Sequence, residues 1–402
     1  MKGKFKMNNI LVVTEGISED YTGGAQTYIH NMTKGLQKKN NNIFIITRKH
    51  NKFDENVEKI NGNNVYRHSY ISKNTFFYKA YPFFSYYNSR KIFNKLNQKH
   101  NFDSINFHFP FSAAGIISDK SSNKIKKTYT FHAPTVEELL NDYKNHNILI
   151  NKSLKLFLPL INKFENYALQ NVDEIIVLSK YMKDKLLNIH NNINEDKINI
   201  IPGGVDTKIF RPLGNKRFES DQIIFFTARR LVPRMGLENL ICAFEQNLKK
   251  HKNIKLYIAG GGPLKEKLRD MIQKRNLNDY INLLGYISKE DLLYYYDKSN
   301  FFVLPTKELE GFGLVTIESM AMGTPVIATP VGGSKEILGK FNKDLLMESI
   351  SVNSISKKID NMIELYKNQE KYRELTIRTR NYVQQNYSWE NITEQINNIL
   401  LS

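Results

Sequence analysis

Short apolar runs alternate along the chain with longer stretches whose apolar residues recur at helical spacing. The first run, Ile10–Val13, leads into a loop with Gly23-Gly24, an amphipathic stretch to about Lys39, and a second apolar run at 43–47. This order predicts a strand, a loop, a helix and a strand, which is how a parallel doubly wound sheet begins. Further strands are predicted at 64–68, 104–108, 127–131, 174–178 and 197–201.

The same pattern starts again after residue 212. Leu237, Leu240, Ile241, Phe244 and Leu248 keep the spacing of one helix face, which predicts a helix that packs on a sheet. Strands are predicted around it at 222–227, 254–259, 281–284, 300–304 and 325–328, with a second helix at 264–275.

The pause near residue 203 predicts two domains in the α/β class, each a doubly wound parallel sheet. The first domain spans residues 1–203 and the second spans residues 204–384. A last helix over about 385–402 is expected to pack back on the first domain. A length of 402 residues leaves room for two cores of this size.

The charge balance indicates anionic partners. The chain has 58 basic and 40 acidic residues, a formal charge of +18. Its one cysteine, Cys242, excludes an intrachain disulfide and fits a reducing compartment. No apolar run has the roughly 18 residues of a membrane helix, and Ile10–Val13 is too short for the core of a signal peptide. We therefore expect a cytoplasmic protein that can attach to the inner face of the membrane.

Two stretches combine apolar and basic residues. Aromatic residues alternate with lysines and arginines from Lys73 to Lys99, and leucines alternate with lysines from Lys152 to Lys163. Either stretch could lie in the interface of an anionic membrane. Aromatic residues that fill the core of the first domain would give the same composition, so both interpretations stay open.

The candidate chemistry is concentrated in residues 305–338. Here Glu310 precedes Gly311 and Gly313, and a helix predicted from Leu314 to Met322 carries Glu318. A helix that begins after glycines offers unpaired N–H groups to a phosphate, while carboxylates accept hydrogen bonds from sugar hydroxyls. A tight turn with two glutamates near a helix dipole is the simpler alternative.

Seven further motifs are distributed over nearly the whole chain. They are GGAQTYIHNMTKGL at 23–36, TFHAPTVEEL at 130–139, DEIIVLSKYMKDKL at 173–186, IPGGVDTKIFRP at 201–212, TARRLVPRMGLENLI at 227–241, AGGGPLKEKL at 259–268 and LLGYISKEDLLYYY at 283–296. In this order, and together with Glu310-x7-Glu318, they resemble the motifs of the retaining glycosyltransferases of family 4, also called glycosyl transferases group 1, which have the GT-B fold.

The resemblance implies roles for individual residues. Glu310 would contact the donor sugar, Glu318 the ribose, and His132 the sugar near the reacting carbon. The backbone of Gly313, Leu314 and Val315 would bind the diphosphate. The resemblance also implies that the donor is bound by Gly23, Gly24, Arg230, Arg234, Tyr286 and Ile287.

The sequence departs from the family at two positions of one motif. Arg229 stands where a glycine is usual, and Met235 stands where a lysine normally neutralises the diphosphate. Arg234, one residue earlier, could take that task.

The resemblance implies a retaining transferase that moves a hexose or an N-acetylhexosamine from a nucleotide sugar, most simply a UDP-sugar. The acceptor would be a glycan or a lipid-linked acceptor in cell-surface polysaccharide synthesis. No Asp-x-Asp triplet occurs, so we expect neither an essential metal nor another cofactor.

Three alternatives remain at this point: a sugar-nucleotide epimerase, a glycan phosphorylase, and a non-enzymatic basic module that binds a membrane or nucleic acid. No RNA-recognition motif or zinc-ligand cluster is present in the sequence, so nucleic acid is not an expected partner.

Overall fold

The computed structural model describes residues 7–16, 23–68, 70, 80–143, 148–214 and 222–402, without the side chains of residues 141–143 and 148–156. Contacts within the chain divide it into two compact units. The N-terminal unit contains residues up to Gly203 together with Trp389–Ser402, and the C-terminal unit is Gly204–Ser388.

The N-terminal unit is built on a sheet in the order β3-β4-β2-β1-β5-β6-β7-β8. All neighbours pair in parallel except β3 and β4. The strands are β1 (Asn8–Val13), β2 (Asn41–Arg48), β3 (Val57–Ile60), β4 (Asn63–His68), β5 (Ser104–Phe107), β6 (Lys126–Phe131), β7 (Glu174–Val177) and β8 (Ile198–Ile200).

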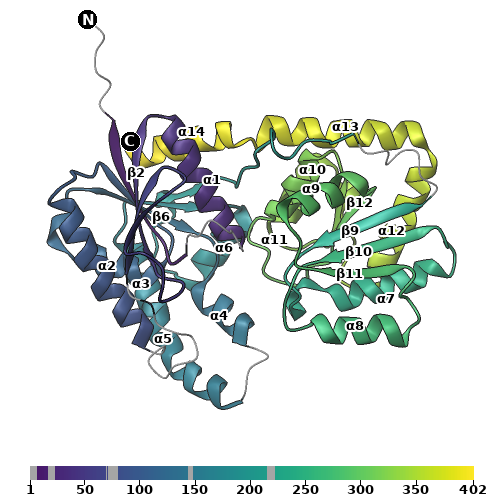
Figure 1. Cartoon of the computed structure of the whole chain (residues 1–402), viewed down its shortest axis with the longest axis horizontal. Coiled ribbons are helices and arrows are strands. Elements are labelled where there is room, and N and C mark those ends of the chain that lie inside the picture. The colour runs from purple at the N-terminus through teal and green to yellow at the C-terminus, as the bar shows by residue number, and fades with distance from the viewer. Residues whose placement is uncertain (1–6, 17–22, 69, 71–79, 144–147, 215–221) are drawn as a thin grey trace, which may run out of the picture. The chain divides into compact units, whose positions relative to one another are not determined.

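Helices cover both faces of this sheet, with α1 and α14 side by side on one face and α2 and α3 on the other (Figure 1). Helix α1 turns Tyr28, Ile29, Met32 and Leu36 into the core, as its apolar spacing predicts. The helices are α1 (Gly24–Lys38), α2 (Tyr81–Asn97), α3 (Pro110–Ile117), α4 (Thr135–Tyr143), α5 (Ile148–Gln170), α6 (Lys180–Ile189) and α14 (Trp389–Leu401), with 3-10 turns η2 (Lys120–Ser122) and η3 (Glu195–Lys197).

The C-terminal unit has an all-parallel sheet in the order β11-β10-β9-β12-β13. The strand order reverses between β9 and β12, and ligands of doubly wound sheets bind at such a point, beyond the carboxyl ends of the strands. The strands are β9 (Ile223–Ala228), β10 (Ile254–Ala259), β11 (Ile281–Gly285), β12 (Phe301–Leu304) and β13 (Val326–Ala328).

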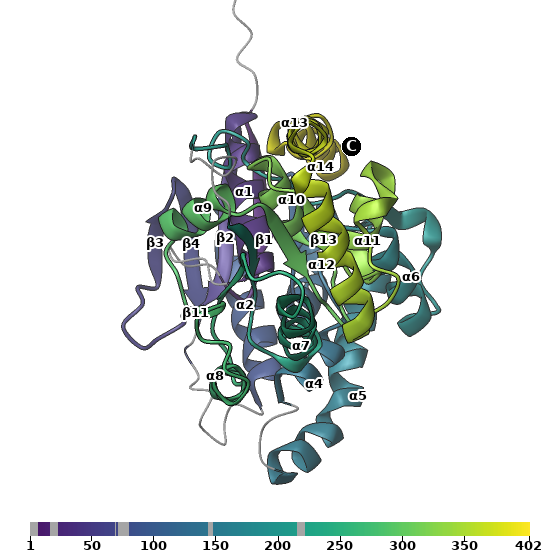
Figure 2. The ribbon, with the colours of Figure 1, turned by 90° about the vertical axis from the view of Figure 1, so that its right-hand side faces the viewer.

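Helices α7 and α12 pack against each other and lie with α8 on one side of this sheet (Figure 2), while α9 and α10 lie on the other (Figure 1). The helices are α7 (Leu237–Leu248), α8 (Lys265–Lys274), α9 (Lys289–Lys298), α10 (Leu314–Ala321), α11 (Gly332–Phe341), α12 (Val352–Lys367) and α13 (Gln369–Asn386), with 3-10 turns η4 (Pro233–Met235) and η5 (Lys343–Leu345). The two sheets confirm the predicted doubly wound α/β architecture.

The aromatic residues of the basic stretch Lys73–Lys99 divide between core and surface. Residues 73–79 lie outside the described part of the chain. Tyr81 and Phe93 are buried, whereas Phe83, Phe84 and Tyr87 on α2 are 42%, 42% and 65% exposed. Core packing therefore explains only part of this stretch.

The leucine- and lysine-rich stretch Lys152–Lys163 lies in α5, and only its second half has described side chains. There Ile161 is buried in a cluster with Tyr81 and Phe111, while Lys163 is exposed. No helix within the described ranges is both long enough and apolar enough to cross a bilayer.

Candidate functional site

The loop between β12 and α10 carries Glu310 at the carboxyl edge of the C-terminal sheet. Two contacts hold this loop. The Arg234 guanidinium donates from Nη1 to the Leu309 carbonyl at 2.6 Å, and the Gly333 amide donates to the Glu310 carbonyl at 2.9 Å. Leu309 has φ of +56°, a left-handed conformation that is rare for a bulky residue. Such strain is typical of functional loops held by their surroundings.

Two side chains, one following β9 and one following the neighbouring strand β12, fix the Glu310 carboxylate. Arg229, which follows β9, forms an ion pair with it, and the Arg229 side chain is only 3% exposed. Thr306, which follows β12, receives a hydrogen bond from Arg229 Nη1 at 2.7 Å and donates to Glu310 Oε2 at 3.3 Å. The arginine at the unusual motif position is therefore part of the site.

Helix α10 begins directly beyond Glu310, as the sequence predicts. Its N-cap, Gly313, has φ of +92°, and a Cβ there would lie 2.1 Å from Ser334 Oγ. Only glycine fits this position. The first hydrogen bond of this helix runs from the Thr316 amide to the Gly313 carbonyl. The amides of Gly313, Leu314 and Val315 come before it in the chain. This N-terminus therefore has the geometry of an anion-binding site.

Glu318 is half-buried on α10, one to two turns from that N-terminus. The Tyr296 hydroxyl donates to Glu318 Oε2 at 3.2 Å. Burial raises the pKa of the Glu318 carboxyl to about 7, although the Tyr296 hydrogen bond and nearby Lys289 oppose the rise. Its charge therefore changes near neutral pH, and its acceptor strength changes with it.

The two predicted diphosphate-binding arginines have different surroundings. Arg230 is the second residue after β9 and is exposed, whereas Arg234 lies in η4, is half-buried and reaches the Glu310 loop through Leu309. Met235, at the family's usual lysine position, is buried.

The predicted base-binding loop follows β11 at the same edge of this sheet. Tyr286 is 74% exposed and Ile287 is half-buried. This segment therefore lies at the surface of the C-terminal unit.

In the N-terminal unit, Gly23 caps α1 in an extended conformation, and Gly24 is the first residue of the helix. No acidic residue lies in the first turn of α1, and a Cβ at Gly23 would meet no atom of the described residues within 4 Å. The positive end of this helix is favourable to an anion.

His132, which follows β6, stacks on His108, which follows β5. His108 Nδ1 and His132 Nε2 share a hydrogen bond of 2.9 Å, and the Tyr28 ring lies edge-on to both imidazoles. Burial lowers the pKa of His132 to about 4 and that of His108 well below its usual value. Both rings are thus neutral at pH 7. His108, for which the sequence favours a structural role, fixes the orientation of the predicted catalytic histidine.

Glu15 is a residue that sequence reasoning missed. It lies just beyond β1, where its Oε1 accepts a hydrogen bond from Ser85 Oγ at 2.5 Å and its buried Oε2 has no hydrogen-bond partner among the described residues. Burial raises its pKa to about 7. Its position after the first buried strand was the available signal, because such positions face the ligand edge of a doubly wound sheet.

Within the described ranges, no three His, Cys, Asp or Glu side chains gather as ligands for a metal ion. The site therefore presents amides, carboxylates and guanidinium groups to a ligand.

Two family profiles match most of the chain. The profile described as "Glycosyltransferase Family 4" matches residues 22–209, and the profile described as "Glycosyl transferases group 1" matches residues 213–382. An uncharacterized glycosyltransferase of Methanocaldococcus jannaschii is 29% identical over 94% of each chain.

Solved structures show the same fold. Sucrose-phosphate synthase from Thermosynechococcus elongatus superposes with a TM-score of 0.77 at 23% identity, over 98% of each chain. The Anabaena protein HepE, solved with UDP and glucose, gives a TM-score of 0.72 at 15% identity, over 98% of this chain and 99% of that one. Together with the site, these matches favour a transferase over the epimerase, the phosphorylase and the basic binding module. The chain belongs to the glycosyltransferases of group 1 and family 4, and it is an enzyme of that class with the GT-B fold.

Proposed function

We propose that this enzyme transfers a hexose or an N-acetylhexosamine from a UDP-sugar to a glycan or lipid-linked acceptor in cell-surface polysaccharide synthesis, with retention of configuration. The observation that carries the proposal is the Glu310 carboxylate, held by Arg229 and Thr306 beside the N-terminus of α10. One short segment therefore holds both a carboxylate that can accept hydrogen bonds from sugar hydroxyls and a helix end that can bind phosphate.

Charge development explains why the reaction would need these groups. When the bond between sugar and diphosphate breaks, negative charge grows on the leaving phosphate. The helix already orients the amides of Gly313, Leu314 and Val315 before the reaction begins. They would therefore stabilise this charge without reorganisation. Arg230 and Arg234 would add positive charge, and we propose that they make a metal ion unnecessary.

The remaining contacts follow from position. Glu318 would accept hydrogen bonds from the ribose, and the backbone around Tyr286 and Ile287 would hold the base. A uracil base is supported by the complex of HepE with UDP, which shares this fold.

In the N-terminal unit, His132 would contact the sugar near the reacting carbon, and Gly23-Gly24 would face the phosphates or the acceptor. We propose a front-face reaction in which no covalent intermediate forms.

We also propose that the enzyme works in the cytoplasm at the inner membrane surface. The exposed Phe83, Phe84 and Tyr87 on α2 are the side chains suited to enter a lipid interface. A basic net charge of +18 favours anionic lipids. Sedimentation with anionic vesicles at low salt tests this location, and protein that stays in the supernatant contradicts it.

The transfer reaction is tested with purified protein and UDP-, GDP- and ADP-sugars in the presence of EDTA. We expect UDP-sugar hydrolysis or transfer that EDTA leaves unchanged. Glu318→Ala removes the proposed hydrogen-bond acceptor for the ribose and should lower kcat/KM about 10- to 100-fold. Glu364→Ala, on the exposed face of α12, is the matched control. Full turnover by Glu318→Ala would show that the site assignment is wrong.

A further inference from the structure

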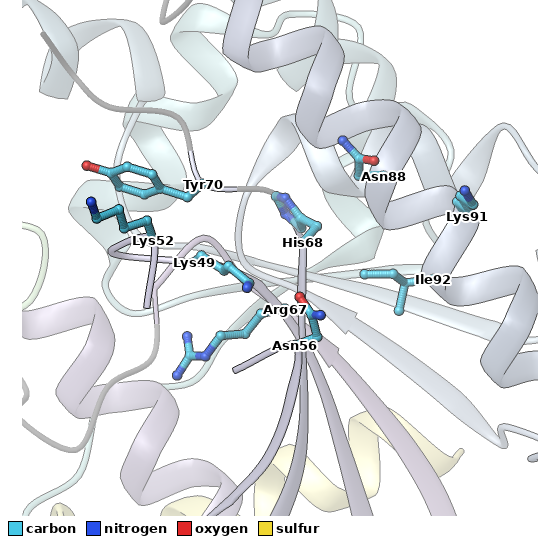
Figure 3. Close-up of a pocket in the computed structure, with 9 residues that line it drawn as sticks. All are labelled: Lys49, Lys52, Asn56, Arg67, His68, Tyr70, Asn88, Lys91 and Ile92. Carbon is cyan, nitrogen blue, oxygen red and sulfur yellow. The ribbon is translucent and has the colours of Figure 1, made fainter. Parts of the chain in front are cut away.

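A separate cavity of about 490 Å³ lies in the N-terminal unit, beside the carboxyl ends of β2 and β4 and against α2 (Figure 3). None of its lining residues belongs to the candidate site described above. Its volume falls in the usual range for small-molecule sites, which is about 300–1,000 Å³.

The lining of this cavity is strongly basic. Lys49, Lys52, Lys91 and Arg67 contribute cations, and the described residues of the lining include no aspartate or glutamate. Arg67 is already neutralised, since its Nε donates to Glu58 Oε1 at 2.5 Å. None of the three lysines has a carboxylate partner among the residues that the structure describes. Three positive charges therefore face one cavity without a counter-charge.

His68 adds an unsatisfied polar group. It ends β4, is 4% exposed, and its Nε2 has no hydrogen-bond partner among the described residues. Figure 3 shows His68 between Lys49 and Lys52 on one side and Lys91 on the other. Because this Nε2 atom is itself shielded from solvent, His68 forms part of the cavity wall, and the lysines are the groups that would meet a ligand.

We propose that this cavity binds a phosphate group carried by the acceptor. Lysines bind phosphate as point charges, and a phosphate dianion would offset most of the uncompensated charge. Because the donor diphosphate is assigned to α10 in the other unit, this cavity is free for a second anion. The assignment to the acceptor rests on the proposed transfer reaction, whereas phosphate binding itself does not.

Two sources supply the same chemistry: a soluble sugar phosphate and the phosphate of a lipid. The test measures binding of glycerol 3-phosphate by calorimetry and of phosphatidic acid vesicles by sedimentation, with phosphatidylcholine vesicles as the lipid control. The variant is Lys49→Gln/Lys91→Gln. Its matched control is Lys59→Gln/Lys99→Gln, which removes the same charge at exposed positions outside the cavity.

We expect the cavity variant to bind at least about tenfold more weakly than the control variant, which should resemble the unaltered protein. Weakened binding of glycerol 3-phosphate identifies a soluble phosphate, and weakened binding of phosphatidic acid vesicles alone identifies a lipid phosphate. Equal binding by the two variants in both assays, or no binding by the unaltered protein, overturns the proposal.

Binding of UDP is measured in parallel and should be the same in all three proteins. If UDP-sugar turnover is absent while phosphate binding depends on Lys49 and Lys91, the proposed function fails and the phosphate site stands. If turnover is present and phosphate binding is not, only the phosphate site fails.

Discussion

Arg229 places a buried positive charge next to the carboxylate on which the proposed donor site depends. A buried charge is tolerated only when it is paired and hydrogen-bonded, and Arg229 has both Glu310 and Thr306. Since removal of one partner leaves the other charge buried and uncompensated, this pair should be more sensitive to substitution than surface pairs are.

We expect Arg229→Met to lower the free energy of unfolding by about 3–5 kcal/mol, because Glu310 would lose its cation while the methionine fills a similar volume. Urea denaturation measures the change. The control is Arg230→Met at the next, exposed position, which should change stability by less than about 0.5 kcal/mol. Equal losses in the two variants would mean that the Arg229 pair contributes no more than a surface contact does.

Sequence reasoning located residues of the proposed site that are close along the chain, and missed those that only the fold brings together. Glu310, Gly313 and Glu318 lie on one loop and one helix, so their spacing was sufficient. Arg229 and Glu310 are 81 positions apart in the sequence, and they come into contact because β9 is the neighbour of β12 in the sheet. Strand order depends on non-local packing, which periodicity does not report.

At the scale of elements, the α10 segment combines a helix end with a backbone conformation that requires glycine. The helix begins at Leu314 as predicted, since two glycines and a following apolar run define its start. The Ser334 hydroxyl packs against Gly313 and also bonds to Thr316 Oγ1 at 2.8 Å, so the start of α11 supports the start of α10.

We expect Gly313→Ala to weaken UDP binding at least about tenfold and to destabilise the protein by about 1–3 kcal/mol, because a Cβ is strained at positive φ and collides with Ser334. Isothermal titration and thermal melting measure the two effects.

Gly339→Ala is the matched control. It lies inside α11, where a Cβ meets no atom within 4 Å and alanine favours the helix by up to about 1 kcal/mol. Unchanged UDP affinity in Gly313→Ala would separate this helix end from nucleotide binding.

The strand β3 shows a sequence signal that went unused. It is short, partly exposed and antiparallel to β4, so it lacks the continuous apolar run that identified the other strands. The turn between them is Asn61-Gly62, with both residues at positive φ. Asn-Gly between two extended segments is the strongest short hairpin signal, and it would have indicated this strand where hydrophobicity did not.

At the scale of the whole molecule, the chain passes from one unit to the other twice, after Gly203 and after Ser388. The final helix, α14, completes the N-terminal unit. A Cβ at Gly35 on α1 would lie 2.2 Å from Thr393 Oγ1, so glycine permits this close packing. Further buried contacts of α14 come from Trp389, Ile392, Ile396 and Leu400.

We expect Ile396→Ala to destabilise the N-terminal unit by about 2–5 kcal/mol, since it creates a cavity between α14 and its neighbours. Hydrogen exchange resolved by peptide should rise in α1 and β6, which contact α14, and stay unchanged in β9 and β10. Ile377→Ala on α13, where the side chain is 61% exposed, is the control. Faster exchange confined to the C-terminal unit would contradict the assignment of α14.

The position of Trp389 determines what an optical experiment on this enzyme can detect. It is the single tryptophan of the chain, 9% exposed, with its indole 5.4 Å from the Tyr28 ring, which in turn lies 5.2 Å from the His132 ring. Intrinsic indole fluorescence therefore originates entirely within the N-terminal unit. A spectral shift on addition of nucleotide would consequently register a change within that unit, whereas silent spectra would say nothing about occupancy at α10.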